Sequence, residues 1–212
     1  MRRNYYTKIL CLMCFLILSG GRLRSQLSIS GPACVTLGTT YLYDIGTGTD
    51  SATIVRICVT GGKLSDSNIA CIKGEAINAV KITWDEGTTT GSISVSSSLS
   101  NSNLNVNITK PLDAGTINLG LKAQIRDTLT LPSVITCTPA SGGHCSPIYS
   151  YQWQQSDDAL KWIDIPGSSG LILRNAKALR QTTYYRRKVT EVNSGSIDYS
   201  DVASVSVNIY GN

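Results

Sequence analysis

The most constraining feature of this sequence is a strict alternation of aromatic and polar residues from Tyr149 to Gln154. Its aromatic members, Tyr149, Tyr151 and Trp153, share one parity, while serine and glutamine occupy the other. A period of two is typical of a strand with one buried face. We therefore predict a central strand here with Trp153 in the core, where a buried indole stabilises the fold by roughly 2–3 kcal/mol.

Short β-rich runs separated by turn residues make up the preceding part of the chain, and no long amphipathic helix is present. These runs are LSISG, TTYLYDI, TIVRICVT, NAVKITW, GSISVSSS and NLNVNIT. Val80, Ile82 and Trp84 share one parity, which predicts a strand that places Trp84 in a core. Regularly spaced short strands of this kind indicate an all-β chain.

The first 25 residues predict a signal peptide rather than part of a domain. They begin with the basic segment MRRNYYTK and continue into an apolar stretch at residues 9–18. This stretch is shorter than the roughly 20 residues that a spanning helix needs. We expect residues 1–25 to be removed, no membrane span to remain, and the protein to be secreted to the extracellular space or the outer cell surface.

The positive charge of the chain lies in this leader. The sequence holds 19 basic and 14 acidic residues, and five basic but no acidic residues fall within residues 1–25. Since 19 − 5 = 14, the mature chain is formally neutral, which gives no support for nucleic-acid binding. The one dense basic run, Arg186 to Lys188, is interpreted as a solvated strand or as cross-strand ion pairs.

About 187 residues remain, enough for two β-sandwiches of about 90–100 residues each. A boundary at Pro111 to Asp113 follows the last β-rich run of the first part. We predict two tandem β-sandwiches, one over residues 26–110 and the other over residues 111–212.

Two sets of motifs carry a resemblance to known modules. The segments I-x-G-P at residues 29–32, Y-x-Y at 41–43 and V-x-I-x-W at 80–84, with Cys34 and Gly38, resemble PKD-like domains of exported bacterial surface proteins. The segments Y-x-Y-Q-W-Q, S-x-D-x-x-x-W and T-T-Y-Y-R-R resemble Ig-like modules of large secreted adhesins and of the N-terminal regions of Rhs-type repeat proteins. The resemblance implies a Gram-negative bacterial surface protein, but such an analogy carries no activity with it.

The segment from Leu179 to Tyr185 resembles the corner of an Ig-like domain, in which a tyrosine hydroxyl bonds back to nearby backbone. Tyr185 is therefore given a structural role. Arg187 lies two residues later, where antibody-type domains have their second cysteine, so the inter-sheet cystine of that class is not expected.

Five cysteines follow the leader, which indicates an oxidising compartment and leaves one thiol unpaired. Cys137 and Cys145 flank a short glycine-rich loop and are the preferred pair, with an expected gain of about 2–3 kcal/mol. Cys34, Cys58 and Cys71 allow three pairings. A Cys58–Cys71 bond would join the strands on either side of Gly61 and Gly62, whereas Cys34 with either would tie the first strand inward; the sequence leaves these open.

No motif supports catalysis or a cofactor. His144 is the only histidine, the mature chain has no C-x-x-C pair, and no nucleophile elbow or phosphate-binding glycine loop is present. Asp157 and Asp158 favour a hairpin turn over a calcium site or an Asp-box, and adjacent carboxylates seldom face one substrate across the gap that a glycosidase requires. We expect no enzyme activity, no metal and no cofactor.

The prediction for function is a non-catalytic spacer or adhesive portion of a bacterial surface protein, released or continued by further domains of a longer chain. The alternative is a binding module for a glycan or protein ligand, with Trp162 and Tyr184 exposed on a strand face. A third hypothesis, an enzyme accessory or cryptic enzyme, would require turnover by the purified chain.

Overall fold

The computed structural model describes residues 26–208 apart from 48–53, 86, 119, 121 and 175. The predicted signal peptide lies outside the described residues. Strands are the only extended regular elements in the described part, as the all-β prediction required. Among these residues there is no helix with the length and hydrophobicity needed to cross a membrane.

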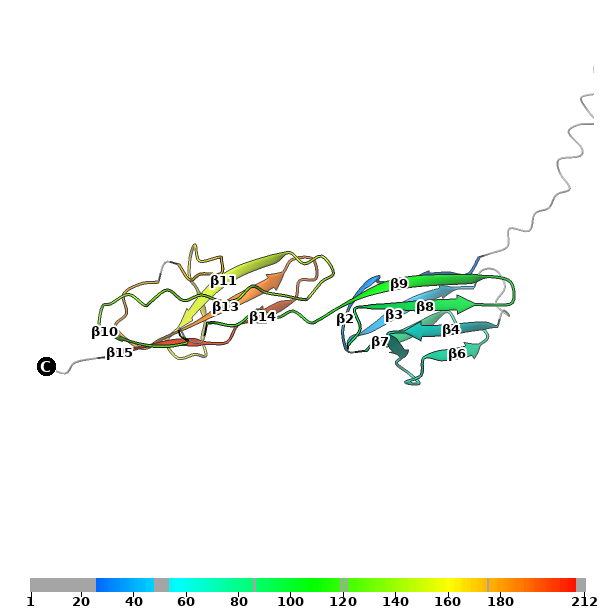
Figure 1. Ribbon diagram of the computed structural model, residues 1–212, viewed down its shortest axis with the longest axis horizontal. Helices are drawn as coiled ribbons and strands as arrows, with labels where there is room; N and C mark the ends of the chain where they lie inside the picture. Colours follow the sequence, from blue (N-terminus) through cyan, green and yellow to red (C-terminus); the bar gives the residue numbers. More distant parts are fainter. Residues whose placement is uncertain are drawn as a thin grey trace, which may run out of the picture.

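Nine strands are described in the N-terminal half, which is a two-layer sandwich (Figure 1). One sheet has the order β1-β3-β7-β5 and the other the order β2-β9-β8-β4-β6. The strands are β1 (Ser28–Ser30), β2 (Cys34–Thr36), β3 (Thr40–Gly46), β4 (Val55–Thr60), β5 (Gly62–Leu64), β6 (Cys71–Gly74), β7 (Ala79–Trp84), β8 (Thr90–Ser96) and β9 (Asn101–Thr109). Most pairs are antiparallel, but β2 runs parallel to β9.

The core of this half follows from the alternation of its strands. On β7, Val80, Ile82 and Trp84 are buried, while the residues between them point away from the core. Trp84 packs edge-on against Tyr43, with ring centroids 6.1 Å apart. The buried residues of this core are Leu27, Val35, Tyr43, Ile45, Val55, Ile57, Val59, Leu64, Val80, Ile82, Trp84, Ile93, Val95, Val106 and Ile108.

One six-stranded sheet dominates the C-terminal half. Its order is β10-β15-β13-β11-β12, and β14 pairs with β13 beside this path. The strands are β10 (Ala123–Asp127), β11 (Tyr149–Ser156), β12 (Ile163–Asp164), β13 (Thr183–Glu191), β14 (Ile197–Tyr199) and β15 (Ala203–Asn208). The predicted central strand is β11, and Trp153 on it is fully buried beside Tyr185 of β13.

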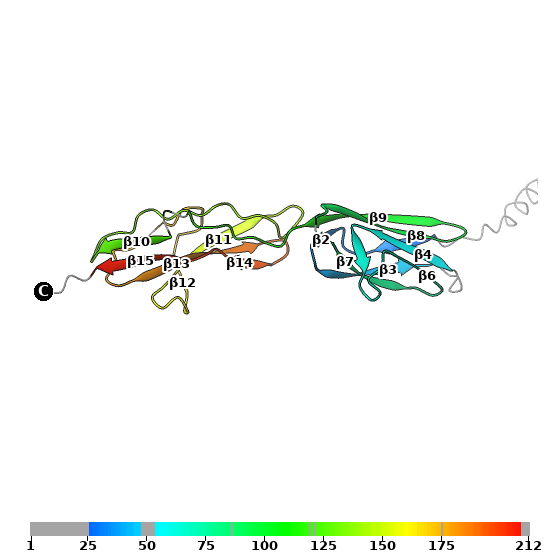
Figure 2. The same cartoon turned by 60° about the horizontal axis from the view of Figure 1, so that its bottom comes forward.

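The layer that faces this sheet is irregular, as Figure 2 shows. In the described residues it contributes only isolated bridges, such as Ile117 with Cys137 and Thr136 with Ile172. Pro132 and Pro139 fall within this layer and lack the N–H that a continuous ladder requires. The second half therefore has the two layers of a sandwich, but only one of them is a hydrogen-bonded sheet.

The disulfides correct one of our expectations. Cys58 and Cys71 are bonded and join β4 to β6, which was one of the pairings left open. Cys145 is bonded to Cys34 of the other half, with Cα atoms 5.9 Å apart, and Cys137 is a free, buried thiol. The predicted Cys137–Cys145 pair was wrong because Cys137 packs inside the C-terminal core, whereas Cys145 contacts Cys34 of β2 and Asn107 of β9 in the other half.

Candidate functional site

The outward face of β13 carries the side chains that form the candidate binding surface. Along this strand Thr183, Tyr185 and other residues of the same parity are buried, whereas Tyr184, Arg186 and Lys188 are only partly buried. A strand exposes alternate residues on one face, so these three project from the outer side of the sheet. The predicted ligand residue Tyr184 therefore lies on this face.

Arg186 lies against two aromatic rings on this outer face. Its guanidinium carbon is 4.2 Å from the centroid of the Trp162 ring and 3.9 Å from that of Tyr199. The distances are those of cation–π contacts. Burial lowers the pKa of Arg186, and the nearby Tyr199 opposes that shift. We call Trp162, Arg186 and Tyr199 the aromatic–arginine stack.

Hydrogen bonds fix the position of the stack across neighbouring strands. Arg186 Nε donates to Gln154 Oε1 at 2.8 Å, and Gln154 Nε2 donates to Asp164 Oδ1 at 2.8 Å. The three residues are adjacent in register on β13, β11 and β12. Arg186 is thus oriented by the hydrogen bond from its Nε. The Asp164 carboxylate accepts its hydrogen bond from the Gln154 amide and not from Arg186.

The turn before β12 brings Trp162 to this position. Asp158 Oδ1 accepts hydrogen bonds from the backbone N–H groups of Leu160 and Lys161, both at 2.8 Å, and from the Ser156 hydroxyl. The bonds from Lys161, Leu160 and Ser156 hold the pKa of Asp158 below its ordinary value. The turn interpretation is confirmed for Asp158, whereas the bond to Asp157 comes from the Gln181 side chain. The described residues contain no group of three or more potential metal ligands.

Sequence reasoning missed Arg186 and Tyr199. The alternation on β13 places Arg186 on the same face as Tyr184, so the first of these could have been found. Tyr199 comes beside it only because β14 folds back antiparallel with Lys188 opposite Tyr199. The stack contains Trp162 but Tyr199 in place of the predicted Tyr184.

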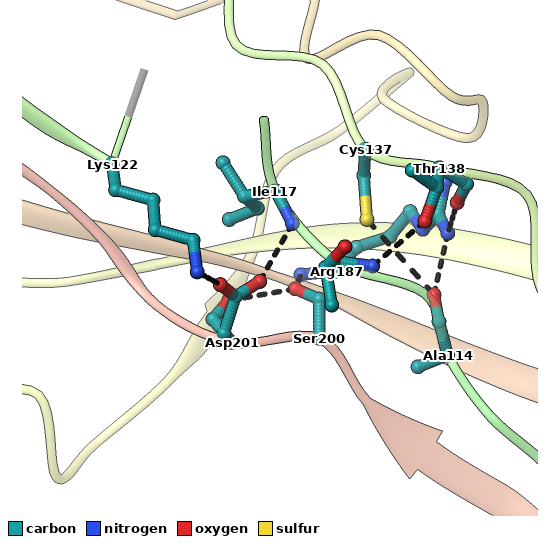
Figure 3. A network of polar contacts seen from close by, with 9 residues as sticks. Ala114, Ile117, Lys122, Cys137, Thr138, Arg187, Ser200 and Asp201 are labelled. Atoms are coloured by element: carbon teal, nitrogen blue, oxygen red, sulfur yellow. Dashed lines mark hydrogen bonds and ion pairs between the residues drawn. The ribbon is translucent and has the colours of Figure 1, made fainter. Parts of the chain in front are cut away.

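The basic run was partly misread, because Arg187 is fully buried rather than solvated or paired with an acid. Its Nη2 donates to the carbonyl oxygens of Ala114 and Thr138 in the facing layer (Figure 3). Its guanidinium carbon lies 4.5 Å from the centroid of the Tyr151 ring. Nε and Nη1 have no hydrogen-bond partner in the described residues. Arg187 therefore links the sheet to the irregular layer through backbone carbonyls.

Cys137 lies close to Arg187 across the core, as Figure 3 shows. Burial raises the pKa of the Cys137 thiol, and the charge of Arg187 opposes that rise. The thiol also lies 3.9 Å from the Ala114 carbonyl oxygen that Arg187 binds. Arg187, which lies where antibody-type domains have their second cysteine, thus faces a free cysteine.

Ser200 and Asp201 extend this polar network toward the surface. Ser200 Oγ accepts a hydrogen bond from the backbone N–H of Arg187 at 2.8 Å (Figure 3). Asp201 Oδ1 accepts one from the backbone N–H of Ile117 at 2.6 Å, and Asp201 also forms an ion pair with Lys122. The loop before β15 is therefore tied to both β13 and the irregular layer.

The predicted tyrosine corner is not formed. Tyr185 is fully buried, but its hydroxyl has no hydrogen-bond partner among the described residues. Burial raises its pKa to about 12. Tyr185 is placed in the apolar core with Trp153 and Leu179, so its contribution is packing rather than a bond to the backbone.

Comparison with known proteins identifies the fold. The model of a family described as a domain of unknown function (DUF8696) matches residues 113–209. A C-terminal fragment of intimin, in complex with the intimin-binding domain of translocated intimin receptor, matches with a TM-score of 0.50 and 16% identity. The match covers 87% of this chain and 65% of the fragment. The fold is Ig-like.

Other similarities are weaker. The tandem Ig repeats of Dlar match with a TM-score of 0.30 at 12% identity, and domains 5–6 of the S-layer protein SbsC with 0.29 at 13%. Each covers 87% of this chain and 98% of the other, and neither adds to the fold assignment. A search of curated proteins found no match.

Proposed function

We propose that the protein is a non-catalytic spacer of an extracellular surface protein, built from two Ig-like domains over residues 26–110 and 111–212. The observation that carries this proposal is the Cys34–Cys145 bond. It links two residues that are 111 positions apart and that belong to opposite halves of the molecule. Two disulfides support a location outside the cytoplasm, where such bonds persist.

The disulfide adds a second covalent connection to a short peptide link. The chain leaves β9 at Thr109, and by Asp113 it is already paired with Ser141 in the C-terminal half. Gly143 N donates to the Lys110 carbonyl oxygen at 2.9 Å. Two chain connections side by side restrict bending more than one does, so the halves are held in the end-to-end arrangement of Figure 1.

Gly142 allows this close approach. It has φ +75°, and a side chain there would overlap with the carbonyl oxygen of Pro111. Tyr149 Oη donates to the Gly142 carbonyl oxygen at 2.8 Å and fixes the loop from the other side. Residues 142–145 and the link at 110–113 therefore form one junction, which suits a spacer of fixed length.

The finer assignments are part of the same proposal. The motifs of the first half favour a PKD-like module and those of the second an Ig-like module of the adhesin or Rhs type, in a Gram-negative bacterium. An adhesive role is supported only by analogy with the intimin fragment, which was seen bound to its receptor.

Small-angle X-ray scattering of the mature chain tests the spacer. The oxidised protein should give one narrow distribution of dimensions, and the Cys34→Ser, Cys145→Ser double variant a broader one. A Cys58→Ser, Cys71→Ser variant is the matched control, because it also loses a disulfide but keeps the junction. If the oxidised wild-type protein were as broadly distributed as the junction variant, the proposal would be wrong.

A further inference from the structure

We propose that the outer face of the C-terminal sheet, centred on Arg186, binds a carboxylate side chain of a protein partner. This surface is separate from the junction, so the inference does not depend on the spacer role. Arg186 projects from β13 between its contacts with Trp162 and Tyr199. The two rings and the bond from Nε to Gln154 hold the guanidinium in one orientation.

The terminal nitrogens of Arg186 are available to a ligand. Neither Nη1 nor Nη2 has a hydrogen-bond acceptor among the described residues, and neither belongs to the buried atoms without a partner. Asp164, the acidic residue of the same row, is bonded to the amide of Gln154. A guanidinium that presents its terminal N–H groups binds carboxylates through two parallel hydrogen bonds, so a fixed and unpaired one fits this ligand.

The surroundings favour a protein over a glycan or another small ligand. The face combines tryptophan, tyrosine and arginine, the three residue types that dominate the energy of protein–protein interfaces. Tyr199 is 42% exposed, and Tyr184 and Lys188 flank Arg186 on the same strand face. These side chains stand on an open sheet surface, whereas small-molecule sites are concave.

An NMR titration of the full mature chain tests this site with defined probes. The first probe is an N-acetylated, C-amidated hexapeptide with three glutamates, and the second is the same peptide with glutamines. Signals of the Trp162 indole N–H and the Arg186 Nε–H should shift with saturation for the glutamate peptide, at an affinity near roughly 1 mM. The glutamine peptide should bind at least about tenfold more weakly.

Arg186→Lys is the decisive variant because it keeps the charge but loses the planar fork. It should weaken glutamate-peptide binding at least about fivefold, whereas the matched variant Lys188→Gln should change it less than about twofold. The dispersion of the remaining signals checks that both variants are folded. The site is refuted if the glutamate peptide gives no saturable shift, or if Lys188→Gln weakens binding as much as Arg186→Lys. Stronger binding of methyl glucuronide than of the peptide would overturn the assignment to a protein partner.

Discussion

The two halves of the molecule solve the problem of a β-sandwich core differently. In the N-terminal half both layers are hydrogen-bonded sheets, and the buried side chains are apolar apart from the tyrosine hydroxyl and indole N–H. The C-terminal half has a single sheet, and all buried polar or charged residues of the described chain lie there: Gln124, Gln154, Ser156, Ser168, Thr183, Arg187, Glu191 and Ser200.

This difference follows from the backbone of the second layer. Where strands are paired, backbone groups satisfy one another and the core can be apolar. Where the layer is irregular, buried carbonyl and N–H groups need other partners. Arg187 supplies donors to Ala114 and Thr138, and Asp201 supplies an acceptor to Ile117. Polar side chains in the C-terminal core thus replace a missing ladder.

The largest effects should come from the core tryptophans. Trp84→Ala and Trp153→Ala should each lower the free energy of unfolding by about 3–5 kcal/mol, measured by guanidinium denaturation followed by circular dichroism. The milder Trp→Phe changes separate the halves. Trp153 Nε1 donates to the Gly170 carbonyl oxygen at 3.0 Å, whereas Trp84 Nε1 has no partner in the described residues. Trp153→Phe should therefore cost about 1 kcal/mol more than Trp84→Phe. Equal costs would contradict the contrast between the two cores.

Arg187 tests whether a polar linker or only its volume is needed. Arg187→Ala should lower the unfolding free energy by about 3 kcal/mol, since it leaves a cavity and removes the donor of the buried Ala114 carbonyl and of the part-buried Thr138 carbonyl. Arg187→Met refills the space and should recover part of this loss. Exposed Arg56 on β4 is the control, and Arg56→Ala should change stability by less than about 0.5 kcal/mol. Equal losses for alanine and methionine would assign the whole effect to the hydrogen bonds.

Glycine substitutions compare the junction with an open turn. Gly142 and Gly38 both have positive φ, at +75° and +69°, so alanine strains either one by about 1 kcal/mol. Gly38 has nothing within 4 Å of an added Cβ, whereas Gly142 meets the carbonyl oxygens of Pro111 and Lys110. Gly142→Ala should therefore lower the melting temperature more than Gly38→Ala and broaden the scattering profile. A larger effect at Gly38 would show that the junction tolerates displacement.

The smallest predicted effect is the loss of stability at acid pH that comes from protonation of Glu191. This residue is fully buried in the C-terminal half. Burial raises its pKa, but donors at Ile148, Ser194 and Asn193 outweigh this and bring it to about 2 from 4.5. Because the folded pKa is the lower one, this stabilisation is present above about pH 4.5 and is lost as the pH falls toward 2. Melting temperatures should fall over this window, and less steeply in Glu191→Gln. Some slope should persist because the pKa of Asp158 is also lowered.

Alternation in the sequence predicted the strands and their buried tryptophans, because one parity is apolar throughout β7 and aromatic in β11 from Tyr149 to Trp153. It failed on β13, where the inward residues include Arg187 and Glu191 beside Tyr185 and Val189. A charged residue at an inward position can only be recognised once its partners are known. These partners are backbone groups of Ala114, Thr138 and Ile148, which leave no signature in a sequence.

Two further features could not be predicted from the sequence, the partner of Cys145 and the aromatic–arginine stack, because both depend on how distant segments meet. Spacing favoured Cys137–Cys145, but the actual partner of Cys145 depends on how the two halves adjoin, and no local pattern encodes that arrangement. The aromatic–arginine stack likewise needs the register of β14 on β13. Local alternation thus determined the strands, while contacts between halves and across hairpins needed the structure.

The Cys34–Cys145 bond also determines how the chain would respond to a pulling force. Tension applied between residues 26 and 208 passes from Cys34 directly to Cys145, so the 111-residue separation between them is bypassed. Because the Cys58–Cys71 bond already bypasses 13 of these positions, the Cys34–Cys145 bond alone withholds the other 98 (111 − 13), or roughly 320–350 Å of extended chain. The shielded segment includes strands β2 to β9 and β10, whereas β11 to β15 stay within the loaded path. Reduction of this single bond would convert a short tether into a long one.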